Sequence, residues 1–145
     1  MPNILVIDQD LHLRRMVRQV LERVGFAVAE AVTLKEVTEQ IAQRVPDVII
    51  LDCLLGGSGL GLDLLRDIRA TPRTHDIPVI LTTGIPEPEI DIRLGNCGAT
   101  AYLLKPFGPR DLVQAVAIAG GIQPPAPGSK PGISCGTLLR PAKSP

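Results

Sequence analysis

Short runs of aliphatic residues alternate with amphipathic stretches along most of this chain. Such short runs are typical of strands buried on both faces, as in a parallel sheet. Apolar residues at spacings of three and four, as in residues 13–24, predict helices with one face turned toward a core. We therefore expect strands at residues 4–7, 26–29, 48–51, 78–82 and 101–104, and helices that begin near residues 11, 34, 60, 89 and 109.

Residues at the ends of the expected helices support this pattern. Asp10 can cap the start of the first helix, and Gly25 can end it. Thr33 and Glu36 have the spacing of a capping box at the start of the second helix. Pro109 suits the first turn of the last helix, where its missing N–H costs nothing.

Strands that alternate with helices predict an α/β fold with a parallel sheet, here a (βα)5 unit. For five such strands, the common doubly wound, flavodoxin-like order is 2-1-3-4-5. The folded domain is expected to span residues 1–120. Residues 121–145 are rich in proline and glycine, so we expect a disordered tail there.

Composition narrows the classes of partner. Lysine plus arginine equals aspartate plus glutamate at 15 each, so no net charge draws the chain to nucleic acid or to an anionic membrane. No segment approaches the about 18 apolar residues of a membrane span, and the N-terminus lacks a signal-peptide pattern. The 3 cysteines have no framework spacing, which fits a reducing compartment. We expect a cytoplasmic protein that contacts neither membrane nor nucleic acid directly.

Two of the expected strands end on a carboxylate, at Asp8 and at Asp52. In the order 2-1-3-4-5 these two strands are neighbours, and the chain reverses direction across the sheet between them. Both carboxylates then lie in the crevice where such sheets bind ligands. Crowded carboxylates repel one another, and oxygen-only ligands suit Mg²⁺. The sequence therefore predicts a magnesium site at this edge.

Two further polar residues, Thr83 and Lys105, follow the fourth and fifth strands and are expected at the same edge. A hydroxyl and an ammonium beside an acidic pair suit the handling of an anion. A carboxylate that attacks a phosphoryl group would use all of these groups. A shift of the strand register by one residue would exchange Thr83 for Thr82.

Four segments carry these residues: 4–8, 46–52, 78–84 and 98–107, which read ILVID, PDVIILD, PVILTTG and GATAYLLKPF. In this order and spacing they resemble the receiver domain of two-component response regulators. The resemblance covers about residues 3–120. It implies a signalling protein, not an enzyme, that receives a phosphoryl group from a sensor histidine kinase or a histidine phosphotransfer protein. A downstream protein target would then read the phosphorylated state.

The resemblance also implies a role for each matched residue. Asp52 is the phosphoacceptor, and Asp8 belongs to the acidic pocket that holds Mg²⁺ together with Asp52 and the backbone carbonyl of Leu54. Lys105 contacts the phosphoryl group, and its bond to Pro106 is expected to be cis.

The same resemblance implies a switch pair. Thr83 is the hydroxyl that senses the phosphoryl group, and Tyr102 is the aromatic residue that responds to it.

This chain departs from the family pattern in three places. Gln9 stands where a second acid is usual, so it can offer Mg²⁺ an amide oxygen but no charge. Asp10 does not replace that acid if it caps the helix. The loop after Asp52 is one residue longer than usual and has Gly56 where proline is common. Further along, the fourth helix is expected to be short or frayed, because its region contains Pro86, Pro88 and Gly95.

Three functions remain open on the sequence. The first is a phosphorylated receiver that acts as a single-domain regulator, since no pattern of a DNA-binding or catalytic domain follows residue 120. The second is a pseudo-receiver, an interaction module that is not phosphorylated because Gln9 weakens the metal site. The third is a flavodoxin-like cofactor binder, which the absence of a phosphate loop after the first strand and the scarcity of aromatic residues disfavour.

Overall fold

The parallel sheet forms in the predicted order. The structure, a computed structural model, describes residues 2–55, 60–84, 97–122 and 140–141. Its strands lie in the order β2-β1-β3-β4-β5-β6, and the first five are parallel to one another. The strands are β1 (Asn3–Ile7), β2 (Ala27–Ala31), β3 (Val48–Asp52), β4 (Val79–Thr83), β5 (Ala101–Leu104) and β6 (Arg140–Pro141).

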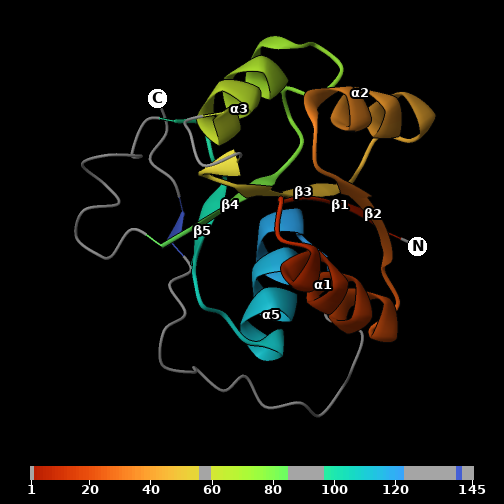
Figure 1. Cartoon of the computed structure of the whole chain (residues 1–145), viewed down its shortest axis with the longest axis vertical. Helices are drawn as coiled ribbons and strands as arrows, with labels where there is room; N and C mark the ends of the chain where they lie inside the picture. The colour runs from red at the N-terminus through yellow and green to blue at the C-terminus, as the bar shows by residue number, and fades with distance from the viewer. Residues whose placement is uncertain (1, 56–59, 85–96, 123–139, 142–145) are drawn as a thin grey trace.

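Two layers of helices cover the sheet (Figure 1). The described helices are α1 (Leu11–Arg23), α2 (Leu34–Gln43), α3 (Leu60–Ala70) and α5 (Pro109–Gly120). Helices α1 and α5 lie together on one face, and α2 and α3 lie on the other. This is the doubly wound arrangement that the alternating pattern predicts. The expected fourth helix falls in residues 85–96, outside the described residues.

Each face of the sheet has its own core, because alternate residues of a strand point to opposite faces. On the side of α2 and α3, strand residues such as Leu51 and Leu81 pack with Leu65. On the side of α1 and α5, strand residues such as Ile50 and Ile80 pack with Leu112 of α5. The strands are therefore apolar on both faces, which is why they appear in the sequence as unbroken aliphatic runs.

The predicted helix ends are confirmed. The Asp10 carboxylate accepts hydrogen bonds from the backbone N–H groups of His12 and Leu13, at 2.9 and 3.3 Å. The Thr33 hydroxyl accepts from the N–H of Glu36 at 3.1 Å. Gly25 has φ +99°, a conformation that only glycine adopts without strain.

Strand β6 was not expected from the sequence. Arg140 and Pro141, in the tail expected to be disordered, pair antiparallel with Tyr102 and Ala101 of β5. An uncovered β5 would present a row of unpaired backbone groups, which a short antiparallel segment can satisfy. Proline is tolerated on such an edge strand. The tail on either side of these two residues lies outside the described residues.

No helix within the described residues combines the length and apolar character that crossing a bilayer requires.

Arg69, at the end of α3, holds together the segments that lead into β4 and β5. Its guanidinium donates to the carbonyl oxygens of Gly98 at 2.8 Å, His75 at 3.0 Å and Ile77 at 2.7 Å. A further bond reaches the Thr100 hydroxyl at 3.4 Å. Burial lowers the pKa of Arg69, although the charge of a nearby acid works in the opposite direction. A single side chain therefore satisfies several loop carbonyls that have no strand partner.

We predict that Arg69→Met lowers the free energy of unfolding by about 2–4 kcal/mol, because it leaves partly buried carbonyls without a donor. Chemical denaturation measures this. Arg66→Met, on the same helix, is the matched control: the Arg66 side chain is 80% exposed and its guanidinium lies no closer than 4.0 Å to Asp63, so stability should hardly change. Equal losses in both variants would contradict the role of the Arg69 contacts.

Candidate functional site

The two strand-terminal carboxylates meet where the sequence places them. Strands β1 and β3 are direct neighbours, and Ile7 is paired with Leu51. Asp8 follows β1, and Asp52 is the last residue of β3. The carboxyl ends of these parallel strands therefore bring both acids to one edge of the sheet.

Lys105 joins the two carboxylates. Its ammonium nitrogen Nζ lies 3.1 Å from Oδ2 of Asp8 and 3.4 Å from Oδ1 of Asp52. These three residues are the ones that sequence reasoning assigned to the acidic pair and its cation. The bond between Lys105 and Pro106 is cis, as the family resemblance implies.

Asp8 is held firmly in this arrangement. Its side chain is only 4% exposed, and Oδ1 accepts the backbone N–H of Asp10 at 2.8 Å. Its carbonyl oxygen accepts a hydrogen bond from Arg14 at 2.7 Å, and Arg14 is in turn paired with Glu30 at 3.0 Å. The sequence analysis did not identify Arg14; its place one helical turn after the capping Asp10 is a signal that could have done so.

Asp52 is the more accessible of the two acids, with a side chain 15% exposed. Its Oδ1 accepts the backbone N–H of Leu54 at 3.2 Å. Helix α3 begins close behind it, because a Cβ at Gly61 would overlap the carbonyl oxygens of Asp52 and Cys53. Asp52 is therefore an oriented carboxylate that a reactant can reach.

The charges around Lys105 favour its ammonium form. Burial alone would lower the pKa of Lys105, but the hydrogen bond and charge of Asp8, together with the charge of Asp52, outweigh it and raise the pKa. The ammonium offsets the repulsion between the two carboxylates.

The donors at this edge fit Mg²⁺. The two carboxylates lie within reach of one ammonium, which shows that they are close enough to share a cation. All candidate ligands are oxygens: Asp8, Asp52, the carbonyl of Leu54 and the side-chain amide of Gln9. Mg²⁺ binds through one or two carboxylates and keeps several waters. Within the described residues no cluster of three or more His, Cys, Asp or Glu side chains offers a metal site, so the donor set has only two acids.

The two threonines of β4 belong to different faces of the sheet. Thr82 is paired with Asp52 in the strand register and shares the face of Ile80. Thr83 is one residue further and shares the face of Leu81, the face on which Tyr102 packs. Both threonines are buried. The predicted switch residues Thr83 and Tyr102 thus lie on the same side of the sheet.

Tyr102 is fully buried, with 1% of its surface exposed. Its hydroxyl lies 3.7 Å from Sγ of Cys97, a contact that the sequence analysis did not anticipate. No sequence signal links these two residues, because Cys97 precedes β5 in a loop without a recognisable motif.

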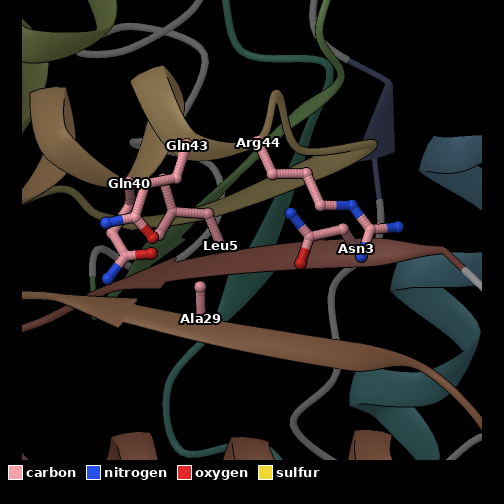
Figure 2. Close-up of a pocket in the computed structure, with 6 residues that line it drawn as sticks. All are labelled: Asn3, Leu5, Ala29, Gln40, Gln43 and Arg44. Atoms are coloured by element: carbon pink, nitrogen blue, oxygen red, sulfur yellow. The ribbon is translucent and has the colours of Figure 1, made fainter.

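A pocket of about 180 Å³ lies away from this edge (Figure 2). Its lining comes from the start of β1, from β2 and from α2 with the residue that follows it, and includes Asn3, Gln40, Gln43 and Arg44. Asn3 begins the strand that Asp8 follows, so the pocket opens at the other end of β1. None of the predicted site residues lines it.

The sequence profile of the response regulator receiver domain matches residues 4–117. The chain belongs to this receiver family. Receiver domains work with kinases in two-component signalling. The match confirms the resemblance and the flavodoxin-like fold that was expected from it.

Similar proteins include transcriptional regulators and solved receivers. The phosphate regulon transcriptional regulatory protein PhoB of Escherichia coli is 36% identical over 124 residues, which is 85% of this chain and 54% of PhoB. KdpE of the same organism is 36% identical over 82% of this chain and 51% of KdpE. This chain therefore spans about half the length of these relatives.

Two solved structures have the same fold. A putative response regulator from Chloroflexus aurantiacus is 32% identical with a TM-score of 0.74, over 83% of this chain and 99% of that one. The chemotaxis protein CheY4 of Vibrio cholerae is 26% identical with a TM-score of 0.74, over 82% and 98%.

We predict a pH-dependent role for Lys105 in stability, measured without Mg²⁺ by chemical denaturation. Its raised pKa means that the stabilising ion pairs are present below the unfolded pKa of about 10.4 and are lost as pH rises through the folded pKa. The receiver should therefore be more stable than Lys105→Met at pH 7–9, and this difference should narrow above about pH 10.4.

The matched control is Lys35→Met. Lys35 is 86% exposed and lies 4.0 Å from Glu39, so its removal should have little effect at any pH. A difference between the receiver and Lys105→Met that stays constant across this pH range would refute the ion-pair account.

Proposed function

We propose that this receiver accepts a phosphoryl group on Asp52 from a sensor histidine kinase or a histidine phosphotransfer protein. The observation that supports this most is the shared contact of Lys105 with Asp8 and Asp52. It supplies an oriented, accessible carboxylate with a cation beside it. That is what attack on an anionic phosphoryl group requires.

The chemistry assigns a task to each group. A carboxylate oxygen of Asp52 attacks phosphorus, and the bond from phosphorus to the donor nitrogen breaks with its electron pair leaving on nitrogen. Lys105 neutralises charge on the phosphoryl oxygens, and the Leu54 N–H keeps Asp52 oriented. Mg²⁺ held by the two acids, the Leu54 carbonyl and Gln9 would neutralise further charge.

The signal would pass from the site to the surface through the opposite face of the sheet. Thr83 stands at the site edge of β4 and shares a face with Tyr102 on the neighbouring strand. A new bond from the Thr83 hydroxyl to the phosphoryl group would change the packing next to Tyr102. The proposed readout is contact with a downstream protein, with the receiver as a regulator and not an enzyme. Regulation of transcription is stated in the names of PhoB and KdpE and belongs to those proteins.

We predict that incubation with acetyl phosphate and Mg²⁺ adds the mass of one phosphoryl group to the intact protein. Asp52→Ala should gain no mass, because it lacks the nucleophile. Asp47→Ala is the control: Asp47 is an exposed acid that precedes β3, and this variant should gain the same mass as the unaltered receiver. Absence of an adduct on the unaltered receiver, or an adduct on Asp52→Ala, would exclude Asp52 as the acceptor.

A second function, an interaction module that works without phosphate, is favoured by one observation. Asp10 cannot readily replace the acid missing at Gln9, because its carboxylate already accepts the N–H groups of His12 and Leu13. The metal site then has only the charges of Asp8 and Asp52. Weak Mg²⁺ binding would leave the phosphoryl oxygens poorly neutralised and phosphorylation slow.

The variant Gln9→Asp separates these two functions. A third carboxylate should strengthen Mg²⁺ binding by roughly tenfold or more, measured by calorimetry, because it adds a full charge at the metal. Under the first function, both proteins take up phosphate and the variant does so faster. Under the second, only the variant gains the adduct. An affinity for Mg²⁺ that does not change would show that residue 9 is not at the metal site.

A further inference from the structure

Thr82 is the one described residue with a buried side-chain oxygen or nitrogen that has no hydrogen-bond partner among the described residues. The residue is 0% exposed, and its hydroxyl oxygen Oγ1 finds no partner in the described part of the chain. Burying an unpaired hydroxyl costs stability, and such exceptions in native proteins need an explanation. Valine has the same shape, is common in strands and would avoid this cost.

The strand register places Thr82 at the acidic site. Thr82 is directly opposite Asp52 on the neighbouring strand and opposite Leu103 on the other side. Directly opposite residues of adjacent strands are about 4.8 Å apart and have side chains on the same face. Rotation about the first side-chain bonds can therefore bring the Thr82 hydroxyl to the Asp52 carboxyl group without movement of the backbone.

Lys105 shields this position. It follows β5 on the same face as Leu103, and it reaches Asp52 and Asp8 across β4, because β4 lies between β5 and β3. The side chain of Lys105 therefore crosses the end of β4 on the face of Thr82, which accounts for the burial of the hydroxyl. A hydrogen bond in such a shielded place is stronger than one in water.

We propose that the Thr82 hydroxyl donates a hydrogen bond to the Asp52 carboxyl group while the phosphoryl group leaves, and so shortens the lifetime of phosphorylated Asp52. This inference rests on the proposed phosphorylation. In hydrolysis, a water oxygen attacks phosphorus and the bond from phosphorus to the Asp52 oxygen breaks. The electron pair returns to Asp52 as a carboxylate, one water proton stays on the released phosphate and the other passes to solvent.

The hydroxyl acts selectively on this step because charge on the Asp52 oxygens grows as the bond breaks. A donor fixed beside that carboxyl group therefore stabilises the transition state more than the phosphorylated ground state. Thr83, on the other face, is not placed to do this. The adjacent threonines would then have separate tasks: Thr82 would act on the leaving carboxylate of Asp52, and Thr83 would act on the face that carries Tyr102.

The test is the rate of phosphoryl loss from the full chain after acetyl phosphate is removed, followed by intact mass. Thr82→Val should lose the phosphoryl group roughly tenfold more slowly, because one hydrogen bond to a charged group is missing. Thr82→Ser keeps the hydroxyl and should decay like the unaltered receiver. Thr82→Ala, which also lacks the hydroxyl, replaces the valine variant if that variant does not fold.

The outcomes separate this inference from the proposed function. Equal decay of Thr82→Val and the unaltered receiver overturns the inference and leaves Asp52 phosphorylation standing. Slow decay of Thr82→Ser also overturns it, since the methyl group and not the hydroxyl would then be responsible. No adduct on the unaltered receiver overturns the proposed function and this inference together.

Discussion

The repulsion between two adjacent carboxylates is the constraint on which the site depends. The fold brings Asp8 and Asp52 together because the chain reverses direction between β1 and β3, and one backbone N–H donates to each carboxylate without cancelling its charge. Lys105, which follows β5 on the far side of β4, reduces this repulsion. Its Nζ lies 3.1 Å from Oδ2 of Asp8 and 3.4 Å from Oδ1 of Asp52. The same two carboxylates raise the pKa of Lys105, because they stabilise its ammonium form. An anion that approaches Asp52 therefore meets a cation that is already held there by the two carboxylates.

Much of the fold could be predicted because its signals are local. Aliphatic runs mark strands that are covered on both faces, and Asp10, Gly25 and Thr33 mark helix ends by hydrogen bonds within a few residues. The strand order then follows from general rules for parallel sheets. The pairing of Arg140 with Tyr102 could not be predicted in this way, because a two-residue strand has no periodicity of its own and depends on an open edge far away in the sequence.

The candidate site was predicted less completely. Asp8, Asp52 and Lys105 could be found because each ends a recognisable strand, so topology alone brings them together. The contacts of Arg14 with the Asp8 carbonyl and of Cys97 with Tyr102 depend on how side chains pack across elements, which spacing does not reveal. The face of each threonine also needed the observed register, since a shift of one residue exchanges Thr82 and Thr83.

Helix α3 is anchored at both of its ends. At its first turn, Gly61 lies so close to the carbonyl oxygen of Asp52 that no side chain fits between them. At its last turn, Arg69 is bonded to the carbonyl of Gly98 and to the hydroxyl of Thr100, just before β5. Contacts at both ends therefore fix the position of this helix relative to the acidic edge and to the segment before β5. In mechanical terms α3 is a strut that links the acidic edge to the base of β5.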